Sequence, residues 1–299
     1  MFAKFLKPVL IALAWVLLFP AALAEESEAP QRVTIRGYFT DAMEPFITKD
    51  GRYLLFNNSN DPRIDTNLQI AVRVDDLTFE YSGAVKGAAS TLLDGVPSMD
   101  REGNLYFVST RDYQQTLATI FRGRFDKGTL SDAVMVPGLS LQKLGQLNFD
   151  AEISADGQTL FAVDGKFSGK PYPDTADIFV AVRDGSGFHR QADSAAILKN
   201  INSPALEYAP AISADQLDLY FTRASRRVRK PPVIMHASRT RISEPFGVPL
   251  PVASITGFVE APSLSADGCS LYFHKRDGDR FRIYRVSSNT KCVPGQPAQ

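Results

Sequence analysis

The chain has 299 residues, and its 33 lysines and arginines balance its 33 aspartates and glutamates, so it carries no formal net charge. Proteins that bind nucleic acid neutralise phosphates with an excess of basic residues. This chain has no such excess, so we expect no nucleic-acid partner. The length suits one large domain and does not by itself require two.

Residues 1–24 have the pattern of a secretory signal segment. Lys4 and Lys7 form a basic start, residues 9–19 form an apolar core, and small residues up to Ala24 form a cleavage site. The apolar run is shorter than the roughly 20 residues of a membrane-spanning helix. We therefore expect cleavage after Ala24, a periplasmic or alternatively a secreted protein, and no membrane span in the mature chain.

After the signal segment, residues 25–31 are polar and are expected to be disordered. Residues 32–39, with the sequence RVTIRGYF, alternate in the manner of a strand but have no hairpin partner of their own. The chain therefore begins its folded part with an isolated strand.

A hairpin motif then occurs five times. Each copy has an approach segment, a short run of alternating apolar and polar residues, a tight turn and a second run rich in aromatic residues. Asp-Gly favours such a turn because glycine adopts a positive φ without steric cost. Gln216 replaces this glycine in the fourth copy, so we expect that turn to differ or to be strained. The acidic turn residues recur at intervals of 52, 54, 59 and 52 residues, at Asp50, Glu102, Asp156, Asp215 and Asp267.

A strand repeat of about 50 residues is typical of a propeller. A third strand follows each hairpin, at residues 67–74, 119–125, 176–183, 233–239 and 280–286, and a weaker fourth strand follows in the first four copies, at residues 79–85, 133–139, 187–192 and 247–253. We therefore predict an all-β fold, a five-bladed propeller of four-stranded antiparallel blades spanning residues 32–293, with a tail at 294–299. The strand at 32–39 is expected to complete the last blade. A sixth, degenerate blade within residues 166–205 is the alternative.

The hairpins of the type S-A-D-G-x-x-L-Y-F resemble the repeats of TolB-type β-propellers, and residues 237–249 resemble a segment between the third and fourth strands of exported bacterial proteins with such repeats. This resemblance covers the mature chain and implies a propeller fold. It also implies a periplasmic scaffold that binds a periplasmic or envelope protein. The TolB family adds an N-terminal α/β domain and six blades, neither of which fits this chain.

The approach segments carry carboxylates that a propeller would gather at one end of its axial channel, which we call the mouth. Like charges at such a place raise one another's pKa values. A small ligand or a divalent cation at the mouth is one interpretation, and capping of turns by the same side chains is the other. The mouth candidates are Asp41, Glu44, Asp94, Asp150, Glu152, Glu207 and Glu260.

Two loops between second and third strands could add to the mouth. The fourth is basic, through Arg223, Arg226, Arg227 and Arg229, and could bind an anionic ligand or an acidic partner. The first could hold a hard cation through Asp61 and Asp65, although it lacks the spacing of a calcium loop.

The mature chain has two cysteines, Cys269 and Cys292, which an exported protein can join in a disulfide. Its histidines, His189, His236 and His274, are too dispersed to indicate a metal motif.

Two functions remain open. A monomeric, non-enzymatic binding or scaffold protein without a cofactor is our first hypothesis, because no catalytic motif occurs. The second is a glycoside hydrolase with a carbohydrate ligand, which would use two of the carboxylates Glu44, Asp150, Glu207 and Glu260.

Overall fold

The computed structural model describes residues 28–61, 63–170, 172–226 and 230–288. These ranges are largely strand, with two one-turn helices, α1 (Tyr113–Thr116) and α2 (Ser194–Ile197). Neither of these helices has the length or the apolar character needed to cross a bilayer. The signal segment, Arg227, Arg229 and Cys292 lie outside the described residues, so the predictions made for them stay predictions.

The described strands form five consecutive antiparallel units, each of which starts with one of the predicted hairpins. Unit 1 has β3 (Met43–Ile47), β4 (Tyr53–Asn57), β5 (Leu68–Arg73) and β6 (Thr78–Ala84); unit 2 has β7 (Asp94–Met99), β8 (Asn104–Ser109), β9 (Ile120–Asp126) and β10 (Thr129–Met135). Unit 3 has β11 (Gln146–Ile153), β12 (Thr159–Lys166), β13 (Thr175–Asp184) and β14 (Gly187–Arg190); unit 4 has β15 (Leu206–Ile212), β16 (Asp218–Ala224), β17 (Val233–Ser238) and β18 (Leu250–Pro251); unit 5 has β19 (Val259–Leu264), β20 (Ser270–Asp277) and β21 (Arg280–Ser287).

Within each unit the strands pair in chain order, so that hairpins follow one another across the sheet. Units 3 and 4 share one sheet because a single parallel pair, Ala176 with Leu206, joins β13 to β15. The predicted third and fourth strands are all present within a few residues of their expected ends. The fourth strand of unit 4 is much shorter than expected and pairs over only two residues.

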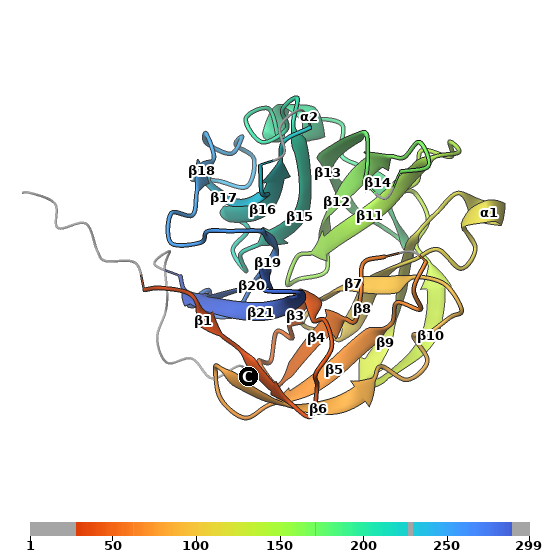
Figure 1. Cartoon of the computed structure of the whole chain (residues 1–299). Helices are drawn as coiled ribbons and strands as arrows, with labels where there is room; N and C mark the ends of the chain where they lie inside the picture. The colour runs from red at the N-terminus through yellow and green to blue at the C-terminus, as the bar shows by residue number, and fades with distance from the viewer. Residues whose placement is uncertain (1–27, 62, 171, 227–229, 289–299) are drawn as a thin grey trace, which may run out of the picture.

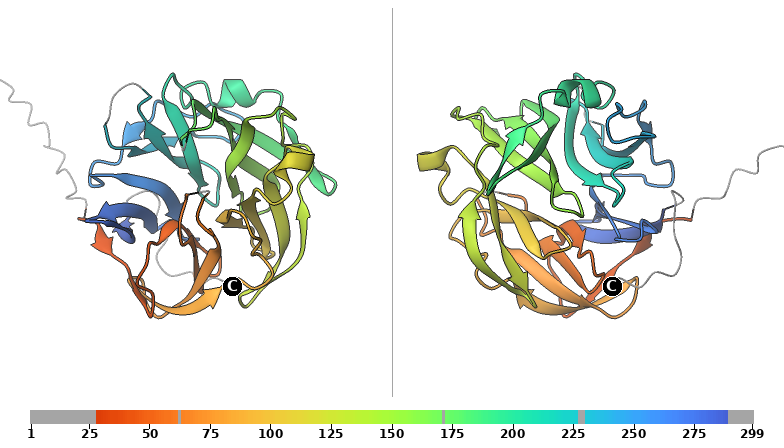
Figure 2. Two further views of the ribbon diagram at one scale, coloured as in Figure 1. Left: turned by 45° about the vertical axis from the view of Figure 1, so that its right-hand side comes forward. Right: turned by 180° about the vertical axis from the view of Figure 1, so that it is seen from behind.

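The first strands of the units gather toward the middle of the molecule, and the later strands lie farther out (Figure 1). Along the chain, β3, β7, β11, β15 and β19 each contact the next, and β19 also contacts β3. The views from the side and from behind show the same arrangement, with β21 next to the N-terminal strands (Figure 2).

The apolar core is divided into five clusters, and each cluster lies between two units. Side chains alternate across a strand, so neighbouring aromatics enter different clusters. Tyr106 packs between units 2 and 3, for example, whereas Phe107 packs between units 1 and 2. Tyr220, Phe221, Tyr272 and Phe273 are likewise at most 4% exposed. These aromatic pairs therefore fill the space between sheets.

The N-terminal strand is divided between two units, which corrects the prediction of one strand at residues 32–39. β1 (Gln31–Arg32) pairs with β21 of unit 5, whereas β2 (Thr34–Arg36) pairs in parallel with β6 of unit 1. The Val33 N–H donates to Ile283 O at 2.9 Å, and the next N–H, of Thr34, donates to Leu77 O at 2.7 Å. Consecutive amides of an extended chain point to opposite sides, so this segment can bond to both units at once.

The polar segment 25–31 is ordered at its end. Gln31 belongs to β1, and the Glu28 carboxylate accepts a hydrogen bond from Ser287 Oγ at 2.6 Å. Residues 25–27 lie outside the described ranges. The boundary of the folded part therefore falls earlier than residue 32, because the edge of β21 offers partners to the segment.

The turn of the fourth hairpin keeps the geometry of the others despite its glutamine. Gln216 has a φ of 59°, compared with 70° for Gly157 and Gly268 at the equivalent position, and its N–H bonds to Ser213 O at 2.9 Å. A side chain in this left-handed region costs free energy that glycine avoids. The turn keeps the common geometry and Gln216 takes a strained backbone, so the prediction that this turn would differ or be strained is confirmed.

Each innermost strand has a β-bulge at the same place in its unit. In four of the five, the first bulge residue has left-handed backbone and precedes a proline; these residues are Glu44, Val96, Ala209 and Ala261. In unit 3 the pair Phe149-Asp150 stands at this position. A bulge interrupts the ladder, so its amide needs another acceptor.

Polar side chains of the neighbouring unit accept these bulge amides. The Val96 N–H donates to Asn57 Oδ1 at 2.9 Å, and the Ala261 N–H donates to Thr222 Oγ1 at 3.0 Å. A Cβ on Gly95 would lie 2.5 Å from Asn57 Nδ2, so only glycine leaves room for this contact. These two bonds link the bulges of units 2 and 5 to the unit that precedes each of them.

We expect Thr222→Val to lower the free energy of unfolding by about 1–3 kcal/mol, because valine keeps the size of the side chain but leaves the buried Ala261 N–H without an acceptor. Urea unfolding measures this change.

Two variants serve as controls. Thr222→Ser retains the hydroxyl and should lose less, whereas valine at the exposed Thr129 should stay within about 0.5 kcal/mol of the parent. A Thr222→Val protein as stable as Thr222→Ser would show that the bond contributes nothing.

Candidate functional site

Two cavities of very different size lie along the line of the innermost strands. The narrow one, of about 30 Å³, is lined by all five bulges and by the prolines within them. It accommodates about one water molecule. Its lining includes Glu44, Pro45, Val96, Pro97, Asp150, Glu152, Ala209, Pro210, Ala261 and Pro262.

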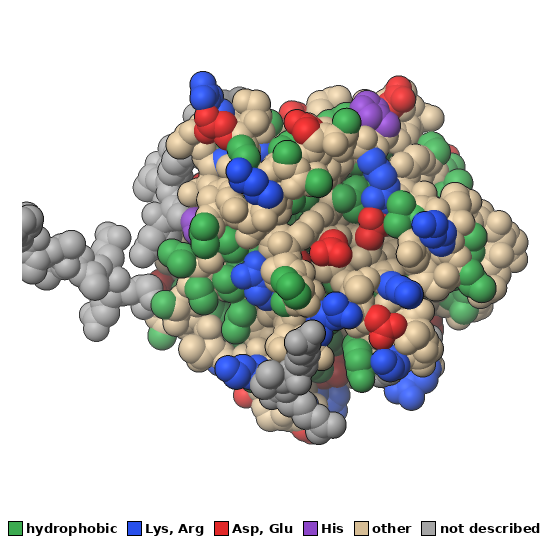
Figure 3. Space-filling model, turned by 90° about the horizontal axis from the view of Figure 1, so that it is seen from above, with side chains coloured by type: hydrophobic (Ala, Val, Ile, Leu, Met, Phe, Trp, Pro, Cys, Tyr) green, Lys and Arg blue, Asp and Glu red, His purple; other side chains and the backbone are tan. Residues whose placement is uncertain are grey.

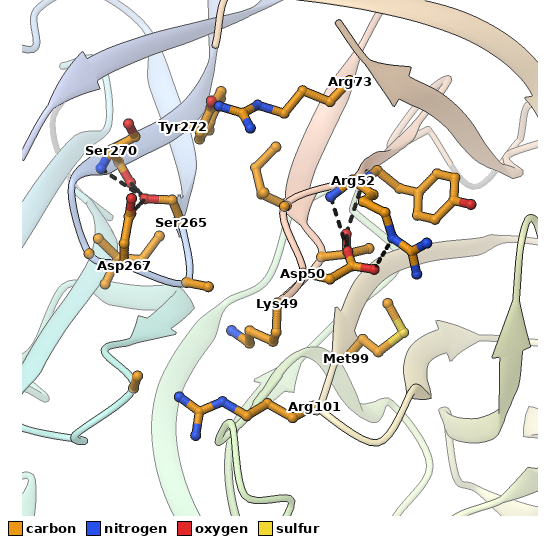
Figure 4. Close-up of a pocket in the computed structure, with 18 of the residues that line it drawn as sticks. Lys49, Asp50, Arg52, Arg73, Met99, Arg101, Ser265, Asp267, Ser270 and Tyr272 are labelled. Atoms are coloured by element: carbon orange, nitrogen blue, oxygen red, sulfur yellow. Dashed lines mark hydrogen bonds and ion pairs between the residues drawn. The ribbon is translucent and has the colours of Figure 1, made fainter. Parts of the chain in front are cut away.

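The large cavity, of about 1050 Å³, lies at the other end of the innermost strands, where each first strand turns into the second. Its walls are the hairpin turns of units 1, 2, 4 and 5 together with Arg73, Asp76 and Arg285 (Figure 4). It lies opposite the predicted mouth, and the site prediction did not include it. The signal was present in the sequence, because the same turns that defined the repeat carry its charged side chains.

An ion pair lies between the two cavities. Lys49 Nζ is 3.3 Å from Glu152 Oε1, and each side chain is 9% exposed. Lys49 lines the large cavity and Glu152 the narrow one. Ser98 Oγ donates to the other oxygen of Glu152 at 2.5 Å. This pair links units 1 and 3 and connects the linings of the two cavities.

At the mouth, two of the predicted carboxylates are held by arginines of their own units. Asp94 lies 2.7 Å from Arg111, and Glu207 lies 2.7 Å from Arg223. Both carboxylates are completely buried. Because an arginine neutralises each of them, neither carboxylate is free to bind a ligand. Arg223 is bonded to Glu207 and is therefore not available for the anion binding predicted for its loop.

Two other predicted carboxylates, Glu44 and Glu260, contact a histidine, and both are close enough to Asp150 for their charges to act on it. Fully buried His274 accepts the Glu44 N–H at Nδ1, 3.2 Å away, and its Nε2 lies 3.2 Å from Glu260 Oε2. The Tyr208 hydroxyl donates to the other oxygen of Glu260. Asp150 Oδ2 accepts the Ala209 N–H at 3.2 Å. The structure thus joins Glu44, Asp150 and Glu260 but leaves Asp94 and Glu207 outside the group.

Burial and mutual repulsion shift the pKa values of this group. Burial raises the pKa of Asp150 well above its ordinary value, and the charges of Glu44 and Glu260 raise it further. Burial also raises the pKa of Glu44, against the opposing charge of His274. For His274 burial lowers the pKa, but the bond to Glu260 and the charge of Glu44 outweigh it and the pKa is raised. The group therefore retains protons more strongly than the same side chains in water.

The remaining predicted residues bond to other groups of the protein or lie away from the mouth. Asp41 Oδ1 accepts the Phe281 N–H at 3.1 Å, and Asp65 accepts from Asn67 at 2.8 Å. Arg63 bonds to Asp61 at 2.6 Å and lowers the pKa of that carboxyl to about 2. Exposed Arg226 faces Asp177. Within the described ranges no three His, Cys, Asp or Glu side chains are arranged to hold a metal ion.

Sequence analysis missed His274, Tyr208, Asn57 and Thr222, all of which hold the mouth together. They lie on second strands or beside the bulges, and their sequence neighbours are ordinary core residues. Nothing in their local sequence distinguishes them, because their partners come from another unit.

The surface of the molecule carries basic and acidic side chains interspersed on the face seen from above (Figure 3).

We expect Asp150→Asn to raise the melting temperature at about pH 8 and to flatten its dependence on pH. A carboxyl with a raised pKa in the folded state binds its proton more tightly there than in the unfolded state, so its stabilising effect is present at low pH and is lost as pH rises. Asparagine keeps an oxygen for the Ala209 N–H. Each kcal/mol gained corresponds to roughly 2–4 °C.

Thermal unfolding of both proteins at about pH 5 and about pH 8 measures the difference. The exposed carboxylate Asp126, changed to Asn, is the control and should leave the pH dependence as it is. A parent protein whose stability rises with pH over this range, with Asp150→Asn parallel to it, would contradict the assignment.

No protein-family model matches the chain, and no curated protein matches it. A solved structure described as a glycoside hydrolase is 11% identical, covers 89% of this chain and 93% of its own, and has a TM-score of 0.60. A putative exo-beta-1,3-galactanase from Bifidobacterium bifidum s17 is 12% identical, covers 87% and 91%, and has a TM-score of 0.56. TolB from Acinetobacter baumannii is 13% identical with a TM-score of 0.45; the match covers 84% of this chain but only 55% of TolB.

At these identities the likeness concerns the fold alone, and the chain spans about half the length of TolB. The predicted membership of the TolB-type repeat family stays a prediction, since no family model matches. Together with the arrangement of the sheets, the structural neighbours identify the fold as a β-propeller.

Proposed function

We propose that this chain is an exported, periplasmic, non-enzymatic binding protein, built as a five-bladed propeller, whose partner or ligand occupies the large cavity at the hairpin turns. The five units would be the blades. Five core clusters, each between two units, support this number, as does the contact of β19 with β3. The pairing of β1 with β21 supports closure of the last blade by the N-terminus.

The proposed binding function rests on one observation, which is the position and the volume of the cavity that can hold a ligand. The mouth leads to a cavity of about 30 Å³, far below the roughly 300–1,000 Å³ of ligand pockets, whereas the turn side offers about 1050 Å³. The predicted mouth carboxylates are bonded to arginines, to His274 or to backbone amides. These bonds give them a structural role, so the turn side is the better candidate for binding.

A glycoside hydrolase is the second candidate, and the group around His274 favours it. A general acid needs a carboxyl whose pKa is raised toward the working pH, and Glu44 and Asp150 meet this requirement. The structural neighbours described as a glycoside hydrolase and a galactanase share the fold. A substrate could not easily reach these two carboxyl groups, since both side chains are buried.

Turnover separates the two candidates. We expect the mature protein, residues 25–299, to release no chromophore from a panel of nitrophenyl glycosides, because the cavity of about 30 Å³ that the described residues form at the mouth does not admit a sugar ring. Turnover that is lost in Asp150→Asn and in Glu260→Gln, with circular dichroism unchanged, would instead establish the hydrolase.

Filling the large cavity tests the binding site. Ala266, half-buried in its wall, changed to Trp should weaken binding of a partner captured from envelope extract by at least ~10-fold, as measured by biolayer interferometry. Tryptophan at the exposed Ala89, which does not line the cavity, is the matched control and should bind like the parent. Equal binding by all three proteins would mean that the partner contacts another surface.

A further inference from the structure

One cationic side chain of the large cavity, that of Arg101, comes from the turn of unit 2. Figure 4 shows it extending into the cavity beside Lys49 of unit 1, whose ammonium is held by Glu152 at 3.3 Å. The Arg101 N–H donates to Ala155 O at 3.0 Å, which fixes the base of that side chain against unit 3. The Lys49 ammonium lies 5.1 Å from the centre of the Phe46 ring.

The Arg101 guanidinium differs from the other arginines of the wall. Arg52 bonds to Asp50 at 2.5 Å, and Arg73 and Arg285 both bond to Asp76. Within the described ranges no ion pair or side-chain hydrogen bond is found for Arg101, although it lies among charged groups. A guanidinium can hold a carboxylate through two parallel hydrogen bonds.

The facing wall supplies acceptors and hydroxyl groups. Asp267 Oδ1 accepts from Ser265 Oγ at 2.6 Å and from the Cys269 N–H at 2.9 Å, so the turn holds this carboxylate in a fixed position. The turn of unit 4 repeats this arrangement with Ser213 and Asp215, at 2.6 Å. The Asp267 carboxylate can accept further hydrogen bonds from a ligand, since a carboxylate has about four lone-pair sites.

We propose that the large cavity binds an acidic saccharide, with its carboxylate at Arg101 and its hydroxyl groups at Asp267 and the turn serines. A hydroxyl both donates and accepts, so a sugar can satisfy a wall on which acids, bases and hydroxyls alternate. The volume of about 1050 Å³ suits several sugar rings rather than one. Tyr53, Phe125 and Tyr272 also line the cavity and offer apolar contact to ring faces. The inference rests on the proposed function, because it takes this cavity as the binding site.

Isothermal titration calorimetry with trigalacturonate tests the proposal, and the fully methyl-esterified trimer is the matched ligand without charge. We expect the acid to bind and the ester to bind at least ~10-fold more weakly. Arg101→Gln should weaken binding of the acid by roughly 10- to 100-fold, the usual contribution of a charge-assisted hydrogen bond, and Arg101→Lys by less. Arg280→Gln, at an exposed arginine outside the cavity, should bind like the parent.

Equal affinity for acid and ester, or equal losses in Arg101→Gln and Arg280→Gln, would overturn the assignment of the carboxylate. Binding of hexaglutamate without binding of trigalacturonate would replace the saccharide by an acidic peptide and also overturn it. If trigalacturonate does not bind while Ala266→Trp still abolishes binding of the captured partner, the saccharide is wrong and the proposed binding function stands.

Discussion

Crowding of the innermost strands at the centre is the constraint on which the rest of this structure depends. Five strands that converge there cannot all keep a regular ladder, and each has a bulge at the same place. Four of the bulges place a residue with a side chain in left-handed backbone before a proline, which costs free energy. Side chains of neighbouring units accept the freed amides, so the same feature that strains each strand also joins the units.

This constraint also explains the character of the mouth. His274, Asn57 and Thr222 are buried polar side chains whose acceptor atoms bond to bulge amides. Asp150 serves the bulge of unit 4 in the same way, at 3.2 Å. The carboxylates that were predicted from their sequence positions to form a ligand site thus bond to other groups of the protein. The prolines and bulges leave little room between them, and the open space lies instead at the hairpin turns, where the strands have no bulge.

Two errors of sequence reasoning share one cause. The strand predicted at residues 32–39 is split because its amides find partners in two units that are distant in sequence, Ile283 of unit 5 and Leu77 of unit 1. Of the predicted mouth carboxylates, Asp94 and Glu207 are held by Arg111 and Arg223. In both cases the deciding contact is made by a residue that local patterns do not connect to the strand or to the carboxylate.

The sequence alone determined the strand content, the five hairpins, the third and fourth strands and the burial of the aromatic pairs, because these follow from alternation of side chains and from turn chemistry over a few neighbouring residues. Only the tertiary structure decided which carboxylates meet, which of them are neutralised, and at which end of the axis a cavity lies. Those outcomes depend on the angles and distances between units, which are set by packing of the five core clusters and by bonds between residues as far apart as Glu44 and His274. No periodicity within one repeat carries that information.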